Sequence, residues 1–191
     1  MRCFVAVDVS PEVRAAVTRA QDAIRKAAPG ADVRWADGQQ IHLTVKFLGA
    51  VPDDRVPAVS SALEGVVAGA RPIALVAAGL GAFPTLRRPR VLWAGLTAGV
   101  PELTALAASV EGALAPLGFP AEGRAFSAHL TIGRVRSPRG GGALAPAVER
   151  ADAAELGAWT ASELVLYESR LRPAGALYVP VSRHRLRGGR A

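Results

Sequence analysis

The sequence predicts an α+β fold with two pseudo-symmetric lobes, each an antiparallel sheet with helices on the outside, that enclose a central cleft. Two observations support this fold. An order of helix, strand, motif strand, helix and strand occurs twice along the 191 residues, and such mixtures form layered α+β domains. The tripeptide His-Leu-Thr, followed by a β-branched residue, also occurs once in each half, at 42–45 and 129–132. A chain of this length suits one domain, so we expect a single domain over residues 1–191, made of two intertwined lobes with one shared cleft.

Each element follows from the local composition. Residues 2–9 are rich in valine and predict a buried strand. Ser10-Pro11-Glu12 is typical of a helix start, because serine caps free N–H groups and proline suits the first turn, and this helix should end before Pro29-Gly30. The other expected helices are 52–70, 101–117 and 144–157. The other expected strands outside the motifs are 33–35, 73–77, 91–96, 159–169 and 176–186. Residues 79–89 should form a loop that carries arginines.

The two motif segments, 41–48 and 128–135, are rich in β-favouring residues and predict strands. Side chains alternate between the faces of a strand, so His and Thr point the same way, while Leu and the β-branched residue point to the other side. The side chains expected to face the cleft are His42, Thr44, His129 and Thr131. The side chains expected in the core are Leu43, Val45, Leu130 and Ile132. Each copy therefore presents one imidazole and one hydroxyl from an apolar-backed strand.

Two His-Thr pairs facing each other across one cleft suit in-line displacement at phosphorus. One imidazole accepts a proton from the nucleophile while the other donates a proton to the leaving oxygen, and an ordinary pKa of about 6.5 allows both protonation states near neutrality. Threonine hydroxyls can donate hydrogen bonds to the non-bridging phosphate oxygens. We therefore predict His42 and His129 as catalytic residues and Thr44 and Thr131 as substrate-binding residues. This scheme requires neither a metal nor a cofactor.

The paired motifs resemble those of the 2H phosphoesterase superfamily, which is defined by two His-x-Thr/Ser motifs. Within that superfamily, the chain is similar to the RNA 2′,3′-cyclic phosphodiesterases, also called 2′-5′ RNA ligases. The resemblance runs almost end to end, and the further segments that carry it are 2–8, 33–35, 46–49, 81–84, 90–95, 126, 164–169 and 175–178. Ala128 and Gly133 stand where the family often has proline and alanine, and we expect adjusted strand geometry there.

The resemblance implies metal-independent hydrolysis of a 2′,3′-cyclic phosphate at an RNA 3′ end. Water attacks phosphorus, the 3′ oxygen leaves and a 2′-phosphate remains; which histidine is the base and which the acid stays open. The same site run in reverse would join RNA ends through a 2′-5′ linkage. One alternative is a phosphodiesterase that acts on a small cyclic nucleotide or another 2′-5′ phosphodiester. Another is a non-catalytic RNA- or nucleotide-binding protein, which would not need two titratable groups.

Lys46 and Arg134 are the remaining substrate-binding candidates. Alternation places Lys46 on the face of the first motif histidine, although a solvated edge lysine would show the same pattern. Arg134 matches an arginine that contacts substrate in the resembled family, but strict alternation places it opposite the second histidine, so a bulge or a strand end is required. His184 has no threonine partner and is expected at the surface. A metal site is the main rival for paired histidines, but neither motif contains an acidic residue to complete one.

The composition is compatible with a nucleic-acid partner. The 23 Lys and Arg outnumber the 16 Asp and Glu, which gives a formal net charge of +7, and arginine suits bidentate phosphate contact. An arginine-rich soluble protein would show the same balance. We expect a monomer whose partner is RNA with a 2′,3′-cyclic phosphate end, tRNA fragments included. Cys3 is the one cysteine, which excludes an internal disulfide. The apolar run after Arg2 is short and no membrane span is expected, so we predict a cytoplasmic protein without a signal peptide.

Overall fold

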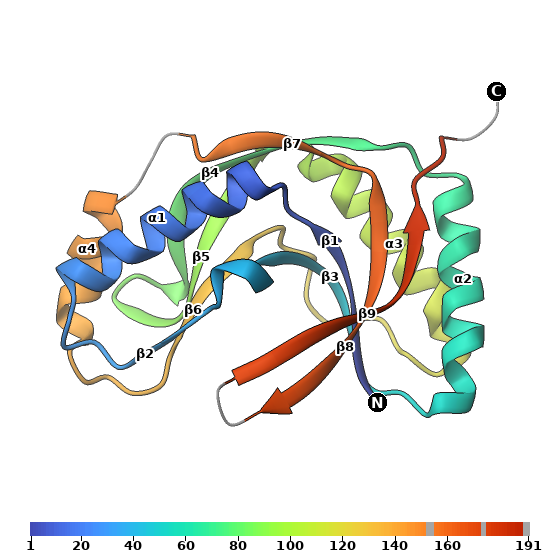
Figure 1. Ribbon diagram of the computed structural model, residues 1–191, viewed down its shortest axis with the longest axis horizontal. Coiled ribbons are helices and arrows are strands. Elements are labelled where there is room, and N and C mark those ends of the chain that lie inside the picture. Colours follow the sequence, from blue (N-terminus) through green and yellow to red (C-terminus); the bar gives the residue numbers. More distant parts are fainter. Residues whose placement is uncertain (152–154, 173–174, 189–191) are drawn as a thin grey trace.

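One curled antiparallel sheet runs through the molecule (Figure 1). The computed structural model describes residues 1–151, 155–172 and 175–188. The strands are β1 (Arg2–Asp8), β2 (Val33–Trp35), β3 (His42–Ala50), β4 (Ile73–Thr85), β5 (Arg88–Ala98), β6 (Leu130–Val135), β7 (Gly157–Ala161), β8 (Glu163–Arg172) and β9 (Gly175–Arg185). The helices are α1 (Pro11–Ala27), α2 (Val56–Ala68), α3 (Val100–Leu114) and α4 (Leu144–Ala151). Within the described residues these strands form a nine-stranded sheet in the order β7-β4-β5-β6-β3-β1-β8-β9, with β2 paired to β6.

The sheet has two halves that meet at β3 and β6. One half continues from β3 to β1, β8 and β9, and the other continues from β6 to β5, β4 and β7. Figure 1 shows α1 and α4 together at one end of the molecule and α2 and α3 at the other. α1 follows β1 in the chain but packs against β6 and β7 of the opposite half. The predicted α+β fold, with antiparallel strands and outer helices, is confirmed.

α1 begins at the predicted residues. The Ser10 hydroxyl oxygen accepts a hydrogen bond from the Val13 N–H at 3.3 Å, and Pro11 occupies the first helical position. The buried side of the helix includes Val17 and Ile24, so an apolar stripe holds it on the sheet. None of the helices that the structure describes is long and apolar enough to cross a membrane.

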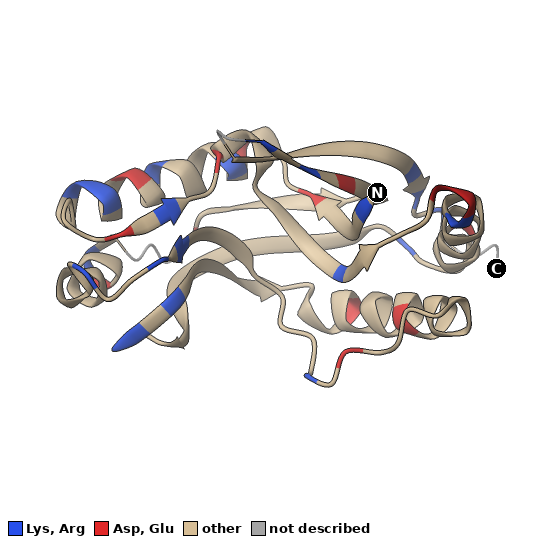
Figure 2. Cartoon of the chain, turned by 90° about the horizontal axis from the view of Figure 1, so that it is seen from below, with Lys and Arg blue, Asp and Glu red and all other residues tan. Residues whose placement is uncertain are grey.

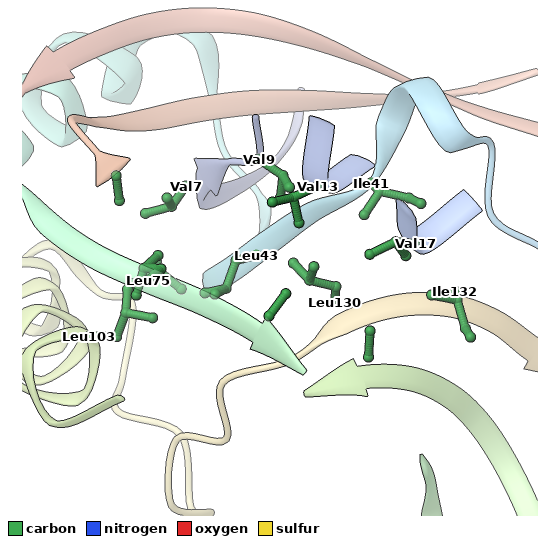
Figure 3. Packing of buried hydrophobic residues seen from close by; sticks show 14 of the residues in the cluster. Val7, Val9, Val13, Val17, Ile41, Leu43, Leu75, Leu103, Leu130 and Ile132 are labelled. Atoms are coloured by element: carbon green, nitrogen blue, oxygen red, sulfur yellow. The ribbon is translucent and has the colours of Figure 1, made fainter. Parts of the chain in front are cut away.

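The hydrophobic core continues across the junction between the two halves. Leu43 of β3 lies directly opposite Leu130 of β6, and both side chains are fully buried. Figure 3 shows the two leucines in one apolar cluster that also contains Val7, Leu75 and Ile132. Burying a leucine side chain contributes about 1.5–3 kcal/mol to stability. Core packing therefore holds the junction, and it reserves the other face of β3 and β6 for the polar motif residues.

Residues 79–89 do not form the predicted loop. β4 continues to Thr85 and β5 begins at Arg88, so most of this segment belongs to a hairpin. Gly81 has a packing role in this hairpin. A Cβ atom at this position would lie 2.4 Å from the indole ring of Trp93, so only glycine leaves room for that ring in this arrangement.

His184 is buried, whereas the sequence predicted a surface residue. Only 4% of the residue is exposed. Its Nε2 lies 2.9 Å from the hydroxyl of Ser182, and its Nδ1 lies 3.1 Å from a carboxylate oxygen of Glu64 on α2. The same carboxylate accepts a hydrogen bond from the Arg187 guanidinium at 2.9 Å. These contacts fasten the end of β9 to α2, and the exposed arginines on either side of His184 concealed its inward position in the sequence.

Replacing His184 with alanine should lower the free energy of unfolding by about 1–3 kcal/mol, because Ser182 and Glu64 lose their shared partner and a cavity remains. Urea denaturation followed by far-UV circular dichroism measures this loss. Arg185→Ala on the same strand changes an exposed side chain and should shift stability by no more than about 0.5 kcal/mol. Equal losses in the two variants would contradict the fastening role of His184.

Candidate active site

The two motifs lie side by side at the junction of the sheet halves. Leu43 and Leu130 are opposite each other in an antiparallel pair, so each motif histidine falls beside the threonine of the other copy. Both leucines point into the core, so their neighbours share the opposite face. We call this the motif face, and its four half-buried side chains are His42, Thr44, His129 and Thr131. Side chains diagonal across such a pair typically lie about 7–8 Å apart at Cβ, which leaves room for a phosphate between the imidazoles.

The two imidazoles are oriented by equivalent backbone hydrogen bonds. Nδ1 of His42 lies 2.8 Å from the carbonyl oxygen of Gln40, and Nδ1 of His129 lies 2.8 Å from the carbonyl oxygen of Ser127. A carbonyl can only accept, so Nδ1 carries the proton in each ring and Nε2 is left for proton transfer. Nε2 of His42 is also 3.0 Å from the Thr44 hydroxyl. Each histidine is thus held in the tautomer that a general base requires.

Aromatic side chains surround both imidazoles. The ring of Phe4 stacks on His42 with centroids 4.8 Å apart, and Tyr178 meets the same imidazole edge-on at 5.0 Å. Phe83 of β4 meets His129 edge-on at 5.1 Å. These contacts restrict the rotation of the imidazoles and remove water from part of each ring. Loss of water disfavours the charged form of an imidazole.

The pKa of each motif histidine is lowered below its ordinary value. For both His42 and His129 the largest cause is burial, which is opposed by the hydrogen bond from Nδ1 to the backbone carbonyl. The positive charge of Arg134 lowers both pKa values further. Both imidazoles are therefore predominantly neutral at pH 7 in the free protein. A bound phosphate, being anionic, would favour protonation of one of them.

Asp8 distinguishes the two histidines. It lies opposite His42 in the pairing of β1 with β3, and its negative charge raises the pKa of that imidazole alone, in part opposing burial. The carboxylate accepts hydrogen bonds from the Tyr167 hydroxyl at 2.5 Å and from the Arg183 guanidinium at 3.0 Å. Across the residues the structure describes, no group of three or more His, Cys, Asp or Glu side chains could hold a metal ion.

Lys46 does not lie on the motif face, so the alternation predicted for the first motif strand is wrong at this residue. In the pairing of β1 with β3, Val5 is opposite Lys46 and Ala6 is opposite Thr44, so Val45 is an extra residue in a bulge. The bulge turns Lys46 into the interior, where it is 1% exposed. Its ammonium donates to Glu111 of α3 at 2.7 Å and to the carbonyl of Pro120 at 2.8 Å. Lys46 therefore ties the first motif strand to the segment that precedes the second motif.

An equivalent bulge places Arg134 on the side of the motif face. In the pairing of β5 with β6, Leu92 is opposite Gly133 and Trp93 is opposite Thr131, so Ile132 is an extra residue in a bulge. Alternation restarts there, and Arg134 becomes exposed on the side of the motif face. Its charge reaches both catalytic candidates, as their pKa values show. Gly133 now points inward, and a Cβ there would lie 2.8 Å from a methyl of Val33. Close packing against β2 thus explains why this chain has glycine at position 133, where the family often has alanine.

Two residues near the site, Phe47 and Asp8, were not identified from the sequence. Phe47 stands five residues after the first histidine, as Arg134 does after the second, and it is 59% exposed. Aligning the two copies beyond the shared tetrapeptide would have revealed this aromatic counterpart of the arginine. Asp8 carried no local signal, because its nearness to His42 arises from strand pairing.

Known proteins share this sequence and this fold. The model of the family described as LigT like phosphoesterase matches residues 7–93 and 96–178. A protein of Methanothermobacter thermautotrophicus named RNA 2′,3′-cyclic phosphodiesterase is 33% identical over 187 residues, which cover 97% of this chain and 99% of that protein. A protein of the same name from Archaeoglobus fulgidus is also 33% identical, over 93% of this chain and 96% of its own length. The crystal structure of a Thermus thermophilus protein has a TM-score of 0.80 and 28% identity, and the match covers 98% of this chain and 99% of that one.

The fold and the paired His-Thr motifs are those of the 2H phosphoesterase class. Escherichia coli LigT in complex with 3′-AMP shares the fold with a TM-score of 0.76 at 24% identity, over 97% of both chains. The family model covers most of this sequence, and the chain belongs to the LigT-like phosphoesterase family. The resemblance inferred from the two motifs is thereby confirmed.

Replacing Arg134 with glutamine should raise the pKa of both His42 and His129, because a nearby cation that disfavours each imidazolium is removed. Titration of the imidazole Cε1 protons by NMR measures the two values. Arg136→Gln removes an exposed cation that is paired with Asp32 and should leave both titrations unchanged. A shift confined to one histidine would contradict the effect of Arg134 on both imidazoles.

Replacing Lys46 with methionine should lower the free energy of unfolding by about 3 kcal/mol, because Glu111 is left without its buried partner. The double variant Lys46→Met, Glu111→Leu removes both charges and should recover part of this loss; denaturant unfolding provides both values. At a temperature where it is folded, Lys46→Met should bind RNA as the native protein does. A large loss of RNA affinity in the folded variant would restore the original prediction of substrate contact.

Proposed function

We propose that the protein hydrolyses 2′,3′-cyclic phosphate at the 3′ ends of RNA to 2′-phosphate, without a metal ion. The observation that carries the proposal is the arrangement of two imidazoles at one junction, each with Nδ1 bound to a carbonyl and Nε2 available for proton transfer. Binding alone would not require two such groups. The names of the relatives from Methanothermobacter and Archaeoglobus support RNA 2′,3′-cyclic phosphate as the substrate class.

In the proposed reaction, water attacks phosphorus in line with the 3′ oxygen. One imidazole accepts a proton from the water as the new P–O bond forms, and the other donates a proton to the 3′ oxygen as the P–O3′ bond breaks. Thr44 and Thr131 hydroxyls donate hydrogen bonds to the non-bridging oxygens, and the Arg134 guanidinium neutralises their charge. Protons and atoms balance. The water oxygen and one of its hydrogens stay on the 2′-phosphate, its other hydrogen goes to the base, and the acid supplies the hydrogen of the new 3′ hydroxyl. A proton moved from the base to the acid then restores both imidazoles.

We assign the general acid to His42 and the general base to His129. The carboxylate of Asp8 lies opposite His42 in the strand pairing and favours its imidazolium form. His129 has no acidic residue among the charges that shift its pKa, so its neutral form is favoured in the free protein. Strand pairing thus supports the distinction that the symmetry of the motifs left open.

Replacing either His42 or His129 with alanine should lower kcat on a short RNA ending in 2′,3′-cyclic phosphate by about a hundred- to ten-thousand-fold. The assay contains EDTA, and the product is identified as the 2′-phosphate by chromatography. RNA affinity and the unfolding transition serve as controls and should change little. The residual activity of His42→Ala should lack the alkaline limb of the pH profile, which reports the acid, and that of His129→Ala should lack the acidic limb.

The other outcomes of this assay point to different functions. Activity that EDTA abolishes would establish a metal site. Turnover of a small cyclic nucleotide or a 2′-5′ linkage, without turnover of the RNA end, would keep the two-histidine chemistry and change the substrate. RNA binding with no turnover under any of these conditions would establish a binding protein.

A further inference from the structure

Exposed arginines form a row that leads away from the motif face. We call Arg34, Arg87, Arg88 and Arg134 the arginine row. Arg34 of β2 lies directly opposite Arg134 of β6, and opposed side chains of antiparallel strands point to the same side. Arg134 is in turn opposite Val91 of β5, and β5 extends from there to its first residue, Arg88, about 10 Å further along. The row thus runs across β2 and β6 to the end of the β4–β5 hairpin.

The arginine row keeps its charge available to a ligand. All four side chains are exposed, and among the described residues none of them is paired with a carboxylate. By contrast, Arg136, Arg170 and Arg183 each form an ion pair with Asp or Glu. Figure 2 shows Lys and Arg at the end of the β4–β5 hairpin without an acidic residue beside them. A row of unpaired guanidinium groups attracts anionic ligands.

The row is connected to the proposed reaction centre at one end. The charge of Arg134 acts on both His42 and His129, so this arginine marks the catalytic end. At Arg34 the start of β9 approaches the row, since a Cβ on Gly175 would lie 3.5 Å from the guanidinium. Arg87 and Arg88 lie further from the motif face than Arg134, at the turn of the β4–β5 hairpin. A polyanion whose end reacts at the motif face can therefore extend along these side chains.

We propose that Arg34, Arg87 and Arg88 bind the phosphates of the RNA strand on the 5′ side of the reacting end. The inference rests on the proposed function and adds a preference to it: an oligonucleotide is a better substrate than a nucleoside 2′,3′-cyclic phosphate. Guanidinium groups hold phosphates in bidentate geometry without reading bases, so the preference is for chain length and not for sequence. Such contacts weaken steeply as salt concentration rises.

The test compares native protein with the triple variant Arg34→Gln, Arg87→Gln, Arg88→Gln on two substrates. For a ten-nucleotide RNA with a 2′,3′-cyclic phosphate end, we expect kcat/KM to fall at least about tenfold at low salt. The slope of log kcat/KM against log salt should become shallower by about two, since each lost phosphate contact on a single strand contributes about 0.7. For a nucleoside 2′,3′-cyclic phosphate, kcat/KM should remain within about twofold.

A second triple variant controls for net charge. Arg19→Gln, Arg71→Gln and Arg150→Gln remove the same charge from exposed positions outside the row and should leave both substrates unaffected. Equal losses with the two triple variants, or equal losses on the two substrates, would overturn the proposal.

Binding separates failure of this inference from failure of the proposed function. If native protein turns over neither substrate, fluorescence anisotropy with a labelled ten-nucleotide RNA ending in 2′-phosphate still tests the arginine row. The row variant should then bind at least about tenfold more weakly than the control variant. Equal affinities would refute the inference irrespective of the reaction that the site performs.

Discussion

The pairing of Leu43 with Leu130 is the constraint on which the rest of the structure depends. It joins the two halves of the sheet at β3 and β6, and both side chains are fully buried. Because neighbouring residues of a strand face opposite sides, burying these leucines turns the histidine and threonine of each motif to the other face. The same strand register therefore satisfies both the packing of the core and the placement of the polar site. A shift of one residue in this register would bury the polar side chains and separate the two imidazoles.

A bulge follows the motif in each half, and the two bulges have different consequences. The bulge at Val45 directs Lys46 into the interior, where it binds α3, and the bulge at Ile132 directs Gly133 against β2. In both copies the next residue is exposed: an aromatic ring in the first and the guanidinium of Arg134 in the second. The site is therefore symmetric in its two His-Thr pairs and asymmetric in the side chains around them.

This asymmetry gives the proposed reaction a direction. The first histidine stands beside Asp8, whereas Arg134 and the exposed arginines beyond it extend from the second motif strand. A neighbouring carboxylate favours an imidazolium acid, and a neighbouring cation without a carboxylate favours a neutral base. In the proposed reaction the phosphate lies where the two settings meet, and the proposed role of the arginine row is to bind the RNA chain attached to that phosphate. The two motif strands thus carry the residues of both proposals, proton transfer and the recognition of a polyanion.

The sequence alone determined the motif strands, the helices with clear caps such as that of Ser10, and the face shared by each His-Thr pair, because these follow from local periodicity and side-chain chemistry. It also revealed the repeated motif and the family. Only the tertiary structure decided which way Lys46 and Arg134 point, since a bulge is a property of two paired strands. It likewise brought Asp8 to His42 and buried His184 against α2. Contacts between residues distant in the chain depend on register and packing, which no local pattern specifies.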